Sequence, residues 1–311
     1  MPLPLHVRTG TIAPREIAAA GSHAIDGALA GDAELSVHSL SGDALILGAF
    51  QRATSADPRL VVRRVSGGPS VAVGKGTIYL VLALDQPHAL TSCDAPKLVN
   101  RYVRPLLRAL TKLGATAHYF GRDWVSVMHR PAGEVVFAHD AQTGRSVVEA
   151  FIAVSTAFEL GPRASFLGKE PGTLETITGR RFEMGKLIDA IVAAYVSAYD
   201  RERRDLAPLP PSTVTDPTRD PPWASTGQEA IGEIGAGPDA TKRFRVGGDL
   251  LASRDAIANL EEHLAVGKKL TNRSEISRIV SQSLAAPGVV LDGVRSLESI
   301  ADVIARGLSD D

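Results

Sequence analysis

Residues 63–77 constrain the fold of this chain more than any other segment, because they place two glycine turns around a short β-branched run. The segment reads Arg-Arg-Val-Ser-Gly-Gly-Pro-Ser-Val-Ala-Val-Gly-Lys-Gly-Thr, and the apolar run Ile78 to Leu84 follows it. This order predicts strands separated by turns. Glycine lets backbone N–H groups approach an anion, and arginine binds anions with a planar fork. Two interpretations stay open from this segment alone: a phosphate or carboxylate site, or a plain hairpin.

Hydrophobic periodicity predicts a mixed β-sheet covered by helices, which is an α+β fold. Helices are expected at residues 13–30, at 96–113, where Gly114 follows the last turn, and at 187–199. Strands are expected at 34–40, 44–50, 60–65, 71–73, 77–84, 115–120, 124–129, 134–138 and 147–154.

Turn and charge signals predict three connections. Ser41-Gly42-Asp43 is expected to join the strands on either side of it as a hairpin. Arg130-Pro131-Ala132-Gly133 is expected to be a second hairpin turn. Residues 200–205 are expected to be the charged, solvated end of the preceding helix.

The composition changes at residues 206–224, where prolines are frequent and apolar residues are few. We expect an extended, semi-rigid linker there. This linker would separate a domain at 1–205 from a small C-terminal α/β domain at 225–311. In the second domain we expect a strand and turn at 244–251 and helices at 254–264, 274–284 and 296–307.

Charge and cysteine usage exclude several classes of protein. The formal net charge is -1, from 34 basic and 35 acidic residues, so no overall field favours nucleic acid or an anionic membrane. A disulfide framework is excluded because Cys93 is the single cysteine, and no His or Cys spacing predicts a metal site. Neither a transmembrane run nor a secretion signal is recognisable, and a cytoplasmic location is therefore expected.

Four short motifs carry a family resemblance. They are Ile46-Leu47-Gly48-Ala49-Phe50-Gln51, the arginine–glycine run Arg63 to Gly68, Gly121-Arg122-Asp123, and Arg130-Pro131-Ala132-Gly133. In order and spacing they resemble the lipoate–protein ligase A family, within the biotin/lipoate ligase and octanoyltransferase superfamily. The resemblance implies a biotin/lipoate-ligase-type sheet domain. It also implies an enzyme that activates lipoate or octanoate with ATP and Mg²⁺ and passes the acyl group to a lysine of a carrier domain.

The resemblance also implies which residues form the site. One of the paired arginines would face the bound carboxylate or phosphate, and Asp123 would lie near the adenylate or its magnesium. Arg130 would take the place of the family's essential lysine. The expected set is Arg130 as the catalytic residue, with Arg63, Arg64, Ser66, Gly67, Gly68, Gly76, Asp123 and Gly133 binding substrate or cofactor.

Several positions depart from the family pattern. Pro69 replaces the third glycine and removes an N–H donor. Arg130 replaces a lysine, and these two cations differ in reach and geometry. Glu149 places a carboxylate near a position meant for anions, where it repels phosphate unless it is paired. Together with Val73 and Thr77, which replace a histidine and an asparagine, these losses indicate a changed activity.

Three functional hypotheses follow. The chain is a lipoate–protein-ligase-like protein that binds a medium-chain acyl group or its adenylate and transfers it to a carrier lysine. Alternatively, it is a catalytically degenerate homologue that acts as a binding or assembly partner. The third hypothesis is an acyltransferase that uses Cys93 as its nucleophile, since a helix N-terminus could lower the pKa of that thiol.

Overall fold

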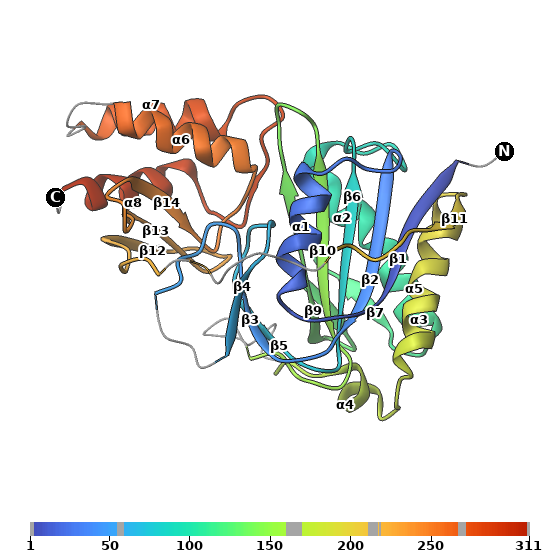
Figure 1. Cartoon of the computed structure of the whole chain (residues 1–311). Helices are drawn as coiled ribbons and strands as arrows, with labels where there is room; N and C mark the ends of the chain where they lie inside the picture. The colour runs from blue at the N-terminus through green and yellow to red at the C-terminus, as the bar shows by residue number, and fades with distance from the viewer. Residues whose placement is uncertain are drawn as a thin grey trace.

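The α+β prediction is confirmed. A computed structural model describes residues 3–54, 59–159, 170–210, 217, 219–266 and 272–309. Within these ranges the chain forms an eight-stranded mixed sheet, a small three-stranded sheet packed on it, and a further group of strands and helices near the C-terminus (Figure 1). No helix in the described ranges is long and apolar enough to span a bilayer.

The large sheet is built around strands whose side chains are buried on both faces. It is parallel between its first three strands and antiparallel from the third onward. Its spatial order is β11 (Glu202–Asp205), β1 (Pro4–Ile12), β2 (Ala33–Leu40), β6 (Thr77–Leu84), β10 (Ser146–Ala153), β9 (Arg130–His139), β8 (Trp124–Val127) and β7 (Ala117–Tyr119).

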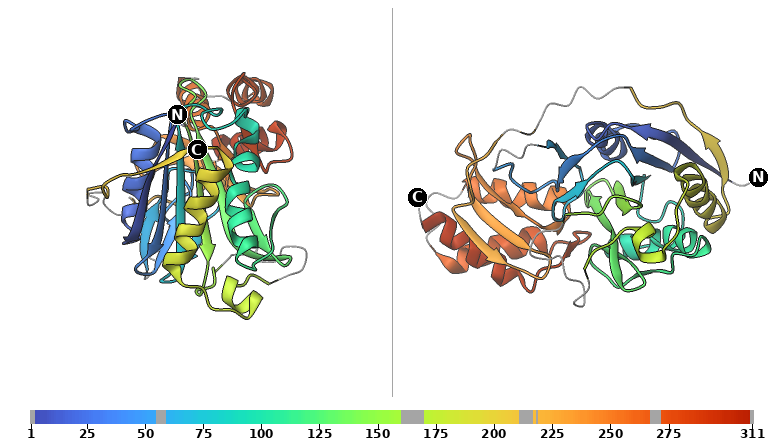
Figure 2. Two further views of the ribbon diagram at one scale, coloured as in Figure 1. Left: turned by 90° about the vertical axis from the view of Figure 1, so that its right-hand side faces the viewer. Right: turned by 90° about the horizontal axis from the view of Figure 1, so that it is seen from below.

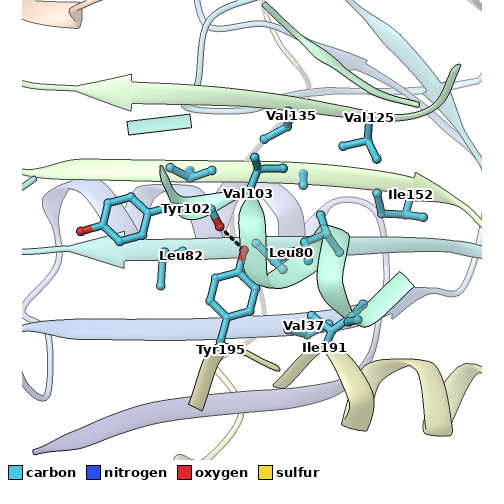
Figure 3. Packing of buried hydrophobic residues seen from close by; sticks show 14 of the residues in the cluster. Val37, Leu80, Leu82, Tyr102, Val103, Val125, Val135, Ile152, Ile191 and Tyr195 are labelled. Carbon is cyan, nitrogen blue, oxygen red and sulfur yellow. Dashed lines mark hydrogen bonds between the residues drawn. The ribbon is translucent and has the colours of Figure 1, made fainter. Parts of the chain in front are cut away.

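One face of this sheet is covered by α2 (Leu98–Tyr102), α3 (Arg104–Lys112) and α5 (Met184–Ala198). The helix predicted at 96–113 is divided at Val103, because Pro105 has no N–H to continue the hydrogen-bond ladder. A 3₁₀ turn, Ala95–Lys97, precedes it, and a short helix, α4 (Leu174–Thr178), precedes α5. The hydroxyl of Tyr195 on α5 donates to the carbonyl oxygen of Tyr102 at 2.7 Å inside this core (Figure 3).

The opposite face is covered by α1 (Glu16–Asp26) and the small sheet, in the order β4 (Leu60–Arg63), β3 (Ala44–Leu47) and β5 (Val71–Val73). Figure 2 shows α1 on the other side of the large sheet from α3. The hairpin predicted at Ser41-Gly42-Asp43 is wrong, since β2 and β3 belong to different sheets. Both edges of β2 are already paired, with β1 and β6. The next strand along the chain, β3, therefore cannot pair with β2 and lies in the small sheet.

Two other predicted connections are also wrong. The turn between β8 and β9 lies at Met128 and His129, which have φ of 47° and 63°, and Arg130 to Gly133 are part of β9. Residues 202–205 form β11, which pairs with the free edge of β1 rather than ending a helix. This strand is exposed along its whole length, so it carries no hydrophobic alternation that the sequence could reveal.

The C-terminal elements have their own apolar cluster. Three helices were predicted and occur, but the glycine-rich strands β12 and β13 were missed, because their side chains are too small to show a strand pattern. Residues 211–216 and 218 of the predicted linker lie outside the described residues. The elements are β12 (Ser225–Gln228), β13 (Glu233–Pro238), β14 (Phe244–Gly248), β15 (Leu251–Ala252), α6 (Arg254–Val266), α7 (Arg273–Leu284), β16 (Leu291–Asp292) and α8 (Leu297–Ser309).

Replacing Tyr195 by phenylalanine removes the bond between α5 and α2. We expect the free energy of unfolding to fall by about 1–2 kcal/mol, measured by urea denaturation. Tyr199→Phe is the matched control, because its hydroxyl lies 3.5 Å from the Arg101 carbonyl oxygen in a partly buried place. It should cost less, and equal losses would contradict a special role for the Tyr195 bond.

Candidate functional site

Arg64 is enclosed between the small sheet and the large one. Its Nη1 donates to Glu134 Oε2 at 3.0 Å, and its Nη2 donates to the carbonyl oxygens of Gly67 and Pro69, each at 2.8 Å. The guanidinium also lies 5.8 Å from the ring centre of Phe151. Because these contacts surround it, Arg64 fixes the curvature of the loop between β4 and β5.

Arg63 points to the other side of β4, as adjacent strand residues must. Its Nη1 donates to the carbonyl oxygens of Gly48, Ala49 and Gln51. Burial lowers the pKa of this guanidinium, and the charge of Asp220 acts in the opposite direction. Both arginines therefore bind backbone carbonyl groups, and the ligand contact predicted for one of them stays a prediction.

Glu149 is the carboxylate that faces the loop between β4 and β5. It is fully buried on β10 and faces the loop. Its Oε2 accepts bonds from the backbone N–H of Ser66 at 3.0 Å and from the Ser66 hydroxyl, and its Oε1 accepts from the Tyr79 hydroxyl at 2.6 Å. Burial, followed by the nearby Glu149 charge, raises the pKa of Tyr79 well above its usual value. An internal carboxylate thus accepts hydrogen bonds from both donors of Ser66 and from the Tyr79 hydroxyl.

The two following N–H groups of the loop are also bonded to the protein. Gly67 donates to the carbonyl oxygen of Phe137 at 3.2 Å, and Gly68 donates to that of Leu250 at 2.7 Å. Gly68 has φ of 90°, which favours glycine, and a Cβ on Gly67 would overlap the Leu250 carbonyl oxygen. The Ser66–Gly68 loop, defined as these three residues, therefore binds the connection between β14 and β15.

The motif after β3 supports the same contact. The side chain of Gln51 accepts from the Gly48 N–H at 2.8 Å and donates to Asp249 Oδ1 at 2.6 Å. The N–H of Gly248 donates to the Phe50 carbonyl oxygen at 2.8 Å. The segments that resemble ligase motifs near residues 46–51 and 63–68 are thus joined to the C-terminal elements.

Arg130 lies at the start of β9. Its Nε donates to the Glu170 carbonyl oxygen at 3.0 Å and its Nη2 donates to that of Pro171 at 3.1 Å. These contacts hold the chain that precedes α4.

The remaining predicted site residues are dispersed. Asp123 is fully buried, with its Oδ1 3.6 Å from Arg122 Nε. Gly76 occupies the turn between β5 and β6 with φ of 101°, and Gly133 lies in β9, where a Cβ would overlap Ile152. Ser66, Gly67 and Gly68 lie together in one loop. Asp123, Gly76 and Gly133 lie elsewhere, and each makes its own structural contacts.

Cys93 belongs to the core on the α2 face of the sheet, whereas Glu149 faces the small sheet. The Sγ of Cys93 lies 3.3 Å from the Asp94 carbonyl oxygen, and burial raises the pKa of the Cys93 thiol. A nucleophilic cysteine needs a lowered pKa, so this environment does not favour the acyltransferase hypothesis.

The sequence indicated part of this site. Glu149 stood out as a carboxylate in a place meant for anions, and the structure supplies its partners. Glu134 and Tyr79 were missed, because each lies 70 residues from the partner that gives it a role. No sequence signal connects such positions without the fold.

Comparison with known proteins shows a shared fold. No family model and no curated protein matches the sequence. Among solved structures, LipL1 of P. falciparum in complex with lipoate matches at 12% identity over 98% of this chain and 99% of that one, with a TM-score of 0.65. A lipoate–protein ligase A bound with ATP matches at 12% identity over 66% of this chain and 90% of that chain, with a TM-score of 0.54.

A third match comes from an archaeal lipoylation system. The bipartite lipoate protein ligase of Thermoplasma acidophilum, described with its E2 lipoyl domain, is 14% identical over 65% of this chain and 88% of that one, with a TM-score of 0.53. The fold of this protein is therefore that of the lipoate–protein ligases, as the motif resemblance implied.

Replacing Gly67 by alanine should separate the loop from the β14–β15 connection. We expect a loss of about 1–3 kcal/mol in the free energy of unfolding, because the new methyl group overlaps a backbone atom. Hydrogen exchange at the Gly68 amide should accelerate. Gly185→Ala on α5 is the control, since nothing lies within 4 Å of the added Cβ, and it should not destabilise the protein. Unchanged exchange at Gly68 would contradict the docking role.

Proposed function

We propose that this lipoate–protein-ligase-like protein binds an acyl group but does not form an acyl-adenylate at its Ser66–Gly68 loop. The observation that carries the proposal is the Glu149 carboxylate, which holds the Ser66 N–H, the Ser66 hydroxyl and the Tyr79 hydroxyl. The protein is then a catalytically degenerate homologue that acts as a binding partner, and it binds an acyl group or the carrier of that group.

Electrostatics disfavour adenylation at the Ser66–Gly68 loop. Adenylation requires donors aimed at the charge that develops on the α-phosphate. Here the three consecutive N–H groups of the loop are bonded within the protein, and Pro69 has none to offer. A phosphate at about 4 Å from the Glu149 charge would be repelled by roughly 4 kcal/mol at an effective dielectric constant of about 20. Binding there would first require Glu149 to move.

The loop region does not fit a magnesium site. Mg²⁺ bound with a nucleotide is held by one or two carboxylates that keep free oxygens. Glu134 pairs with Arg64, Glu149 accepts from Ser66 and Tyr79, and Asp123 lies beside Arg122. In the described part of the chain, no group of three or more His, Cys, Asp or Glu residues is arranged around a metal position.

Acyl binding is supported by the fold and by the neighbours that share it. LipL1 of P. falciparum is in complex with lipoate, and the bipartite ligase of Thermoplasma acidophilum is described with its E2 lipoyl domain. A ligand of the same chemistry, free or attached to a carrier lysine, is the proposed occupant here. The proposed protein partner is a lipoyl-type carrier domain.

An active ligase is the second candidate, and one contact favours it. The Gly68 N–H is bonded to Leu250, a residue of the C-terminal elements rather than of the sheet domain. Movement of the β14–β15 connection would free this donor. ATP and Mg²⁺ would then be the cosubstrate and metal, and lipoate or octanoate the acid.

Native mass spectrometry separates these candidates. The intact protein is mixed with octanoate or lipoate, ATP and magnesium. We expect a mass increment equal to the acid alone, because the loop donors are occupied. An increment equal to the acyl-adenylate would contradict the proposal and establish the ligase. Arg130→Lys is a useful companion variant, since gain of adenylate there would show a site lacking only the family lysine.

Glu149→Ala tests whether the carboxylate occupies an anion position. The variant leaves buried donors unpaired and should lose about 1–3 kcal/mol of stability for each. Formate should raise the melting temperature of this variant but not of the wild type, because it replaces the missing carboxylate. Asp94→Ala, at an exposed site, is the control and should show no formate effect. Equal formate responses in all three proteins would oppose the assignment.

A further inference from the structure

The outer face of α2 and α3 carries positive charge only. No aspartate or glutamate occurs between Asp94 and Asp123, although the whole chain has 34 basic and 35 acidic residues. Cations recur there at intervals of three or four residues along the two helices, and one more lies beside the end of α3. They are Arg101, Arg104, Arg108, Lys112 and Arg180, called here the α3 basic stripe.

Helical geometry places these side chains in one row. Val103 joins α2 to α3 with helical backbone angles, φ of -74° and ψ of -21°, so the helical spacing continues through it. At about 100° per residue, the cations from Arg101 to Lys112 fall within about 80° of arc and extend over about 16 Å. The row continues past the helix, because a Cβ added to Gly114 would lie 2.4 Å from Arg180 Nη1.

The cations of the stripe form no ion pair with a carboxylate among the described residues. Arg101 is partly exposed and the other members are exposed. Arg104 donates to the carbonyl and side-chain oxygens of Asn100, one turn earlier, at 3.1 and 2.9 Å. By contrast, Arg273 on α7 pairs with Glu298 at 2.8 Å. The positive charge of the stripe is therefore directed to solvent without internal compensation.

This arrangement does not stabilise α3 by itself. Arg104 is the first residue of α3, where the helix dipole favours negative charge. The pairs Arg104–Arg108 and Arg108–Lys112 place like charges four residues apart, which destabilises a helix. Lys112, in the last turn, has the sign that the dipole favours. An anionic partner along the stripe would replace the repulsion between its members by attraction.

Neighbouring charges limit how wide this anionic partner can be. α5 packs beside α3 and exposes Asp189, and Glu183 is exposed just before α5 begins. A bilayer surface or a nucleic-acid duplex is wide enough to meet these carboxylates, which repel its phosphates. A single acidic helix or extended segment can lie on α3 alone, and arginine forks fit its carboxylates.

The stripe also lacks the aromatic side chains on which bases stack. The single aromatic residue between Arg101 and Lys112 is Tyr102, which is 0% exposed. Without a stacking surface, a single-stranded nucleic acid would be held by charge alone. The local chemistry thus favours a protein partner.

We propose that the α3 basic stripe is a docking surface for an acidic protein, whose carboxylates lie along a helix or extended segment that faces α3. The stripe is on the α2 face of the large sheet, whereas α1 and the small sheet cover the other face (Figure 2). A partner bound to the stripe therefore leaves the Ser66–Gly68 loop uncovered. This docking goes beyond acyl binding and does not depend on it.

Fluorescence anisotropy with a labelled acidic peptide tests the stripe. The peptide is an alanine-rich helix of about 20 residues, long enough to be helical alone, with glutamates at the intervals of the stripe. It should bind the wild type at low salt and bind less tightly at physiological salt, because exposed charges are screened. The same peptide with glutamine in place of glutamate should not bind.

Charge variants locate the binding. The double variant Arg104→Gln with Arg108→Gln should weaken the acidic peptide about fivefold, since each exposed ion pair contributes roughly a factor of two. The matched control is Arg243→Gln with Arg278→Gln, which removes two exposed arginines from the C-terminal elements. This control should bind the peptide as the wild type does.

Two further measurements separate docking from a structural role and from the loop. The melting temperature of the Arg104/Arg108 double variant should not fall, because the substitutions remove repulsion between like charges. A fall would indicate that these arginines stabilise the fold, and would oppose the proposal. The Glu149→Ala variant should bind the acidic peptide with wild-type affinity, since Glu149 faces the other side of the sheet.

Three results would overturn the assignment. They are absence of peptide binding by the wild type at low salt, equal affinity of the wild type and the Arg104/Arg108 variant, and equal binding of the glutamine peptide. Competition with duplex DNA and with phosphatidylserine vesicles decides the class of partner. If either displaces the acidic peptide at a lower concentration of negative charge, the stripe binds phosphates and the protein partner is wrong.

Discussion

The charge of Arg64 is enclosed between two sheets at 1% exposure, and the shape of the site depends on how that charge is neutralised. Glu134 supplies an opposite charge, and the carbonyl oxygens of Gly67 and Pro69 supply dipoles. Removing one partner of such a buried pair costs about 3–5 kcal/mol, because the other charge stays buried without compensation. The loop is therefore curled around its own arginine, and its carbonyl groups point inward.

This curled loop turns its N–H groups outward, and the protein itself uses them. Glu149, on β10 of the large sheet, accepts from the Ser66 N–H, and Leu250, in the C-terminal elements, accepts from the Gly68 N–H. In this protein, one loop thus joins the small sheet, the large sheet and the C-terminal elements. The same contacts that stabilise this arrangement occupy the N–H groups of the Ser66–Gly68 loop.

Much of the fold was readable from the sequence, because long buried strands and amphipathic helices leave strong periodic patterns. Strands β6 and β10 and helix α5 occur where the pattern predicted them. Two of the failures share one cause. Whether β2 continues into a hairpin depends on whether its edges are free, and whether residues 202–205 form a strand depends on the open edge of β1. Whether a strand edge is free depends on strands that are distant in the sequence, so a short segment does not reveal it.

The sequence by itself determined the α+β class, the family of folds, and the position of an unusual carboxylate, Glu149, beside a glycine loop. These follow from periodicity, motif order and residue chemistry, which are properties of short segments. Only the tertiary structure decided that Glu149 bonds Ser66 and Tyr79, that Leu250 takes the Gly68 N–H, and that both arginines bind carbonyl groups. Those contacts join residues 70 or more positions apart or depend on how a loop closes, and a hydrogen bond exists only when the fold brings donor and acceptor within about 3 Å.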